Sequence, residues 1–331
     1  MTYSSAGLIE ASDYNGFAND TSNANVNAQW GTGATDKGYG QSTTLASVSA
    51  AGTVTATNWA ALCARITSMA SHTSTAITSR TSPSTSDTVT ILAALNTDLT
   101  NLHTNRGNAA ASGSQFTGWS GTTAKTGTTG SGAAAWTLTF THTITWSSAA
   151  AARYFFNAGG LVKWETSKTA DSTAADTEWN DLANTLVGDI YISGGTATQR
   201  IAGSDYTGTT KVGGTGTATT LTTTTGWYDL TTSDTEIYKQ FADTSPYTGS
   251  FIRINAKTAT SGTQLVLTTA WTDPGGSGTG SSDDISGGTA PSGVTPGSAP
   301  ATIVSYYPPS ATYLTEQTWG NATVLAAVAT T

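Results

Sequence analysis

The chain has 331 residues, of which only 10% are charged and 37% are apolar, and 13 Lys and Arg against 21 Asp and Glu give a net charge of −8. Average globular proteins have about 25% charged residues, more than twice the fraction in this chain. Thr, Ser, Gly and Ala are abundant instead. An acidic chain with scattered cations lacks the basic face that binds phosphates, which argues against nucleic-acid binding and polybasic membrane docking. A single cysteine excludes an intramolecular disulfide and a Cys-based zinc cage.

Two runs of apolar residues at helical spacing predict helices within residues 1–110. The first run has Thr57 or Asn58 as its N-cap, and the second ends near Gly107. The apolar residues of these seams, which are candidates for oligomerisation or attachment, are Trp59, Leu62, Ile66, Met69, Leu92, Leu95, Leu99 and Leu102. Each seam lasts about one and a half heptads, so a helical hairpin or a short trimeric bundle is favoured over a long coiled coil. A weaker helix is expected between Ser12 and Trp30.

Residues 111–135 consist mostly of Gly, Ala, Ser and Thr and are predicted to be a linker. From Trp136 to Trp146 the period changes to two, with only Thr on one face, which predicts a strand whose His142 lies on the buried face as a structural residue. A short helix is expected around Asp176 to Leu186. Further strands are expected at 153–156, 161–165, 188–193, 227–230, 250–256, 264–271 and 302–307.

These elements predict an α+β chain, with a helical N-terminal region at 1–110 and a mainly antiparallel, sandwich-like β domain at 136–331. Residues 273–300 are rich in Gly, Ser and Pro and are expected to form a long surface loop within that domain. No catalytic, cofactor-binding or metal-binding residue is predicted. The motifs of zincins, α/β-hydrolases and P-loop proteins are missing. The clustered carboxylates suit a solvated turn or helix face as easily as a cleft, and their spacing does not distinguish these places. They are Glu165, Asp176, Glu178, Asp181 and Asp189.

The histidines carry no catalytic pattern either. His72 and His103 each fall near the end of a predicted helix, where a cationic ring favours the C-terminal dipole.

One string is more specific than these patterns. Arg153-Tyr154-Phe155-Phe156-Asn157-Ala158-Gly159-Gly160 resembles an "RYFFNAGG" segment of virion structural proteins in tailed phages, notably those infecting cyanobacteria and other marine bacteria. Residues 11–17, residues 38–41 and the Trp59 helix resemble the opening of the same group. We interpret 153–160 as a β-hairpin, in which Tyr154 and Phe156 share one face and Asn157 to Gly160 turn the chain. The group contributes no catalytic residues.

The resemblance implies a non-enzymatic structural component of a tailed-phage virion. Within it we favour a trimeric fibre-like appendage of the tail or neck, whose partners are other copies, other virion proteins of the tail, neck or baseplate, and a host surface glycan. The first residues carry no secretory signal, so the expected location is the virion, after synthesis in the host cytoplasm. Two alternatives stay open: a tailspike-like enzyme that depolymerises polysaccharide, and a capsid-decorating or baseplate subunit.

Overall fold

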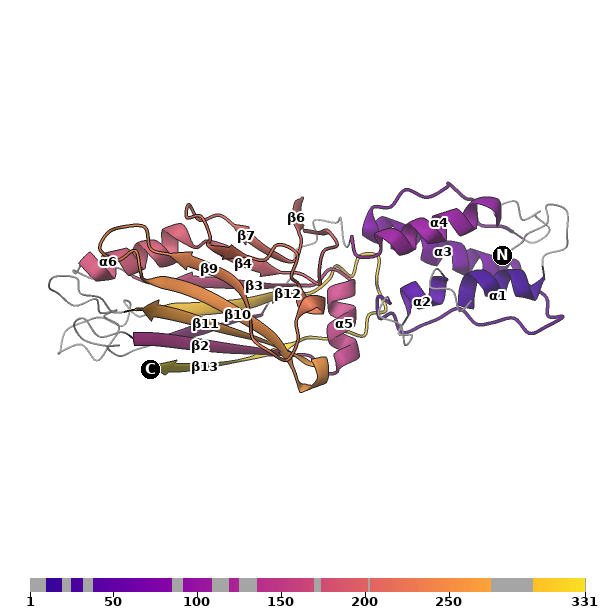
Figure 1. The fold of residues 1–331 in the computed structure, drawn as a ribbon. Coiled ribbons are helices and arrows are strands. Elements are labelled where there is room, and N and C mark those ends of the chain that lie inside the picture. The colour runs from indigo at the N-terminus through magenta and orange to yellow at the C-terminus, as the bar shows by residue number, and fades with distance from the viewer. Residues whose placement is uncertain are drawn as a thin grey trace.

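The protein has a helical lobe and a β-sandwich lobe laid end to end (Figure 1). The computed structural model describes residues 10–19, 25–31, 38–84, 92–108, 119–124, 136–169, 174–201, 203–274 and 300–330. The first helix and the end of the last strand lie at opposite ends of the long axis (Figure 1). The predicted α+β class with a sandwich-like antiparallel β domain is confirmed. Most of the predicted 273–300 loop lies outside the described residues.

The described residues of the N-terminal lobe form four helices. They are α1 (Ala11–Asn19), α2 (Val26–Trp30), α3 (Ala56–Thr73) and α4 (Leu92–Asn105). The prediction of Thr57 or Asn58 as the cap of α3 is wrong, because Thr55 is the N-cap. Asn58 is instead the third helical residue, and its side chain accepts from the Thr55 backbone N–H at 2.9 Å while Thr55 Oγ1 accepts from the Asn58 N–H at 3.3 Å. This reciprocal capping box satisfies two donors at the start of the helix.

The apolar seams of α3 and α4 form the interior of the helical lobe. Their described side chains are each at most 2% exposed, and they are Trp59, Leu62, Ile66, Met69, Leu95, Leu99 and Leu102. The side chain of Leu92 lies outside the described set. The weaker helix expected between residues 12 and 30 is divided into α1 and α2, and the rings of Tyr14 and Phe17 on α1 pack on Trp59.

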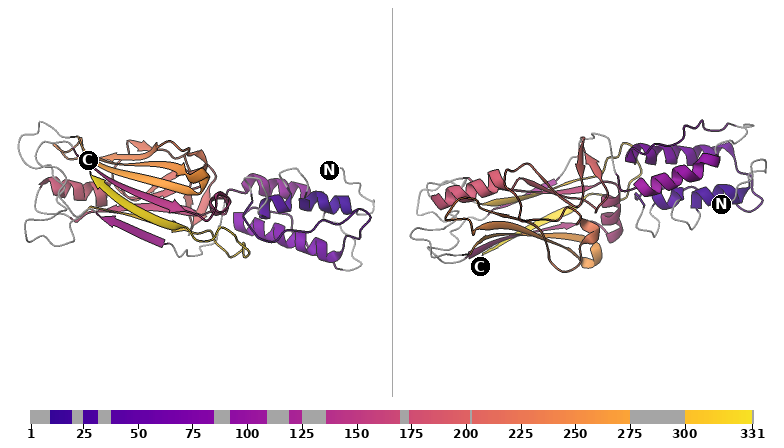
Figure 2. Two further views of the ribbon diagram at one scale, coloured as in Figure 1. Left: turned by 90° about the horizontal axis from the view of Figure 1, so that it is seen from below. Right: turned by 45° about the horizontal axis from the view of Figure 1, so that its top comes forward.

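Two antiparallel sheets face each other in the second lobe (Figure 2). The five-stranded sheet has the order β1 (Trp119–Ala124), β12 (Ala301–Tyr307), β3 (Leu161–Ser167), β4 (Asp189–Ile192) and β7 (Thr209–Val212). The six-stranded sheet has the order β13 (Thr323–Thr330), β2 (Trp136–Thr145), β11 (Gln264–Asp273), β10 (Phe251–Ala259), β9 (Thr235–Phe241) and β8 (Thr220–Leu221). A separate hairpin joins β5 (Gln199–Ile201) to β6 (Ser204–Tyr206).

The predicted alternation in β2 is confirmed. The side chains of Leu138, Phe140, His142 and Ile144 are completely buried between the sheets, whereas the intervening threonines are partly exposed. β2 pairs with β11 on one side and with β13 on the other. A central strand with one apolar and one threonine face therefore separates the core from solvent, as the period of two requires.

Three predicted elements need correction. The β-hairpin predicted at 153–160, with a strand at 153–156, is wrong, because 153–157 belong to helix α5 (Ala149–Asn157), where the Ser148 cap and the alanines favour a helix. The segment 227–230, also predicted as a strand, contains the short 3-10 helix η2 (Trp227–Asp229). The predicted linker 111–135 contains β1, which pairs antiparallel with β12 at the edge of the five-stranded sheet.

The helix expected around 176–186 is present as α6 (Ala174–Asp181), continued by the π-helical turn η1 (Leu182–Leu186).

A buried hydrogen bond between Trp164 and Thr269 links the facing sheets. The indole Nε1 of Trp164 on β3 donates to the Thr269 hydroxyl on β11 at 2.8 Å, and both side chains are completely buried. Trp164 cannot reach water in this position, so its N–H depends on this one acceptor among the described residues.

We expect Thr269→Val to lower the free energy of unfolding by about 1–3 kcal/mol, because the indole N–H stays buried without an acceptor. The matched control is Thr268→Val, the same substitution on the outward face of the same strand, which should change stability by less than about 0.5 kcal/mol. Urea denaturation measures both. Equal losses in the two variants would contradict the assigned role of the bond.

Candidate functional site at the junction of the lobes

Helix α5 lies across the end of the sandwich that faces the helical lobe (Figure 1). Its N-cap Ser148 accepts a hydrogen bond from the Ala151 backbone N–H at 3.0 Å, and the first turn consists of alanines, the best helix formers. The helix ends where Gly159 takes a positive φ of 97°. At Gly160 a Cβ atom would lie 2.4 Å from the Phe155 ring, so only glycine allows this close approach.

One face of α5 seals the β sandwich. Phe155 lies 5.3 Å from the ring of Trp146 and 6.0 Å from that of Tyr306, measured between centroids. Phe156 stacks on Trp227 at 5.2 Å. Both phenylalanines are at most 1% exposed, so they close the core at this end of the sheets.

The other face of α5 contacts the helical lobe. The ring of Tyr154 packs on the backbone of Gly40, where a Cβ would lie 2.6 Å from the ring. The Asn157 amide donates to the Gly38 carbonyl at 2.9 Å. Two strings singled out by resemblance, 38–41 and 153–160, therefore meet at the junction of the lobes.

His72, in the last turn of α3, is a junction residue that the sequence analysis did not identify. Its Nε2 donates to the Ala158 carbonyl at 3.1 Å, and its ring packs edge-on against Tyr39 at 5.3 Å. The side chain is completely buried, and this burial lowers the pKa of His72 to about 4. The predicted role as a cation at the helix C-terminus is therefore wrong, since the ring is neutral at pH 7. Its position three residues after Met69, on the apolar seam of α3, was the signal that could have indicated its burial.

A backbone bridge also joins the lobes. Gln41 pairs antiparallel with Gln317, which precedes β13. The Ser42 N–H donates to the Glu316 carbonyl and the Thr318 N–H donates to the Gly40 carbonyl, both at 2.8 Å. The helical lobe thus contacts the sandwich through α5 and through the β12–β13 connection, which fixes one lobe against the other in two places.

A cavity of about 440 Å³ opens beside α5 between the two lobes. Arg106 and Gly107, just beyond α4, line it from the helical lobe. Its β-lobe wall includes Phe156, Gln199 and Tyr228. The motif residues Phe156 and Asn157 thus border a cavity, and no part of the sequence pattern predicted it.

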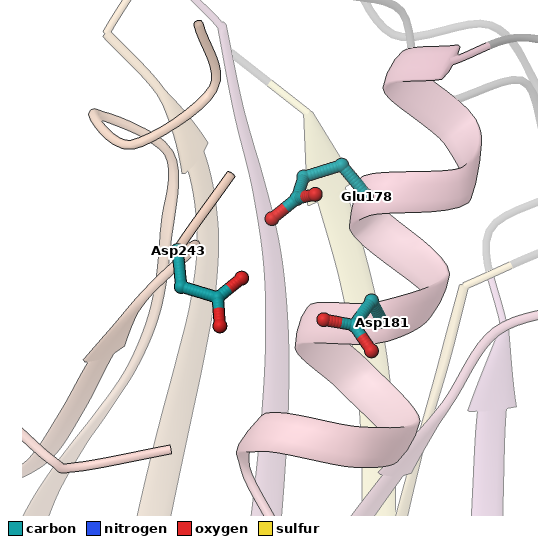
Figure 3. A group of neighbouring side chains, drawn as sticks. All are labelled: Glu178, Asp181 and Asp243. Atoms are coloured by element: carbon teal, nitrogen blue, oxygen red, sulfur yellow. The ribbon is translucent and has the colours of Figure 1, made fainter. Parts of the chain in front are cut away.

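Three carboxylates converge at the other end of the sandwich, between α6 and the connection that follows β9 (Figure 3). One oxygen from each of Glu178, Asp181 and Asp243 lies within 4.8 Å of the others. Glu178 is buried and accepts from the Thr244 backbone N–H at 3.3 Å, whereas Asp243 is exposed. Oxygen ligands of this type suit Ca²⁺, but acidic groups also gather without an ion.

The other carboxylates of the predicted cluster do not join this group. Asp176 is completely buried, not solvated, and pairs with the equally buried Lys168 at 2.5 Å. Glu165 and Asp189 flank Lys163 on the outer face of the five-stranded sheet, at 2.6 and 2.8 Å from its Nζ. The structure thus distributes the five acids over three separate places.

Comparison with known proteins gives no relative. No family model, no curated protein and no solved structure matches the chain. Among the described residues, no helix is long and apolar enough to cross a membrane.

Gly40→Ala should lower the free energy of unfolding by about 2–4 kcal/mol, because the new Cβ meets Tyr154 and the residue must keep its positive φ of 67°. Gly320→Ala is the matched control, since its φ is 63° and nothing lies within 4 Å of the added Cβ. The control has only the backbone cost, about 1–2 kcal/mol. If urea denaturation shows equal losses, Tyr154 does not pack on Gly40 as described.

Stability should fall as the pH drops from about 6.5 to 4, through His72 and His142. Burial lowers the pKa of each ring to about 4, so in this window the unfolded chain binds protons that the folded chain does not. The full window corresponds to about 3 kcal/mol per histidine. Urea denaturation across this range should show that His72→Gln, whose amide can still donate to Ala158, loses about half of this histidine-dependent change. An unchanged slope in this variant would contradict a neutral, buried His72.

Proposed function

We propose that the chain is a non-enzymatic structural component of a tailed-phage virion, a trimeric fibre-like appendage of the tail or neck. Its partners are two further copies of the chain and other proteins of the particle, and its location is the virion. The helical lobe attaches the protein to the particle, while the β lobe projects outward with its threonine-rich sheet face toward solvent.

The observation that carries this proposal is the meeting of the resembling strings in space. Residues 38–41 contact 153–160 at the junction, through Gly40 with Tyr154 and Gly38 with Asn157. Residues 11–17 contact the Trp59 helix, through Tyr14 at 5.7 Å and Phe17 at 6.3 Å between ring centroids. The four short segments that resemble the phage proteins thus pair in space. One pair packs together inside the helical lobe, and the other pair joins the helical lobe to the β lobe. This pairing supports a resemblance that extends to the fold.

The shape also supports the proposal. Two lobes laid end to end and joined by buried contacts make a stiff, elongated unit, which suits a part that projects from a particle. The apolar core is continuous from Trp59 in the helical lobe through Phe155 to Trp271 in the sandwich. A flexible linker between independent domains would lack this continuity.

The purified full chain should behave as a trimer of about 101 kDa, three times its mass of 33.6 kDa, in light scattering coupled to size-exclusion chromatography. A monomer at every concentration tested would contradict the trimer. Peptides of the chain should also be found in purified particles of the phage that encodes it, and their absence from those particles would contradict the virion assignment.

The polarity can be tested separately because the described ends lie far apart. A gold label on an N-terminal tag should lie close to the particle in electron micrographs, and one on a C-terminal tag should lie farther out. The reverse order would mean that the β lobe attaches and the helical lobe projects.

A further inference from the structure

Gln199, on β5, lies in the wall of the cavity beside α5. Its side chain is 3% exposed, and its Nε2 donates to the Phe156 carbonyl at 2.6 Å. This bond fastens the end of α5 to the hairpin of β5 and β6, so this wall of the cavity has a fixed position.

An exposed aromatic ring forms one wall of the cavity. Tyr228 is 44% exposed although neighbours hold it in place. Its ring packs edge-on against Trp227 at 4.9 Å, and its hydroxyl donates to Asn157 Oδ1 at 2.6 Å. Because the hydroxyl is directed to α5, the flat apolar face of the ring is the part that a ligand can contact.

One acid and one base complete the lining, each from a different lobe. Asp229 is exposed, and its carboxylate is oriented by the Gly226 backbone N–H at 2.9 Å. The bare backbone of Gly195 lies beside it, where even an added Cβ would stay 3.7 Å from Asp229 Oδ2. Across the cavity, the Arg106 guanidinium has five N–H donors, one of which goes to the His103 carbonyl at 2.5 Å. The two charges cancel, so the lining favours a neutral ligand over an anion or a cation.

We propose that this cavity binds a neutral saccharide. A pyranose ring carries hydroxyls that donate and accept around its rim, and it presents an apolar C–H face. Its donors match the Asp229 carboxylate, its acceptors match Arg106, and its C–H face matches the Tyr228 ring. The volume of about 440 Å³ lies within the usual range for small-molecule sites. Because both lobes line the cavity, the bound sugar also fastens them together.

The proposal depends on the cavity alone and not on the virion assignment, so either can fail without the other. The test uses the full chain and a panel of glucose, galactose, mannose, N-acetylglucosamine and N-acetylgalactosamine with their disaccharides. Isothermal titration calorimetry and saturation-transfer NMR at sugar concentrations up to about 10 mM should detect at least one binder, which should also raise the melting temperature.

Paired variants locate the binding. Tyr228→Ala and Tyr228→Phe both lose the hydroxyl bond to Asn157, but only the first loses the ring. Affinity should fall at least about tenfold in Tyr228→Ala and stay within about threefold in Tyr228→Phe. Asp229→Asn, which keeps an acceptor for the Gly226 N–H, should bind several-fold more weakly. Tyr247→Ala, in the β9–β10 connection near the acidic group, should bind as the unmodified chain does.

Circular dichroism shows whether each variant is folded. If Tyr228→Ala does not fold, Tyr228→Leu and Asp229→Asn replace it as tests. The proposal is overturned if no sugar of the panel binds, or if folded variants at Tyr228 and Asp229 bind with unchanged affinity.

Discussion

The arrangement of the whole molecule depends on helix α5 packing against both lobes at once. Consecutive residues of a helix point about 100° apart, so a run of aromatic residues spreads around the helix instead of lining one face. Phe155 and Phe156 close the end of the sandwich, while Tyr154 and Asn157 contact the helical lobe. A strand would have placed Tyr154 and Phe156 on the same side, and it could not have joined the two lobes in this way.

The polar contacts at the junction follow from that apolar arrangement. Where α5 meets the helical lobe, the backbone carbonyls at its end and at Gly38 lose water and need donors. His72 and Asn157 supply them, and the His72 ring must stay neutral because it is completely buried. Gln199 does the same for the Phe156 carbonyl, to which its Nε2 donates. In all three cases a buried polar side chain satisfies a backbone carbonyl at the junction.

Sequence patterns predicted the fold correctly where the local signals agreed with one another. In β2 the strict alternation and the β-branched threonines agree, and the strand covers Trp136–Thr145 of the predicted 136–146. In α5 the signals conflict, because the aromatic residues favour strands whereas Ser148 and the alanines favour a helix, and the cap and propensity prevailed. β13 was missed because its alanines give no alternation, and β2 determines its conformation by pairing with it. The junction and its cavity were not predictable, since their residues come from segments of both lobes that only tertiary folding brings together.

The seams of α3 and α4 show what such patterns can and cannot say about assembly. A short apolar stripe must be covered, but its spacing does not identify the cover. Here the chain itself covers Leu62, Ile66 and Leu99, which are at most 2% exposed. A trimer of this folded chain therefore needs other surfaces than the seams. Among the described residues the most exposed large apolar side chain is Leu325, 71% exposed on the edge strand β13. An edge strand offers unpaired backbone groups to a neighbour, so assembly through the β lobe is compatible with helices that are already fully packed.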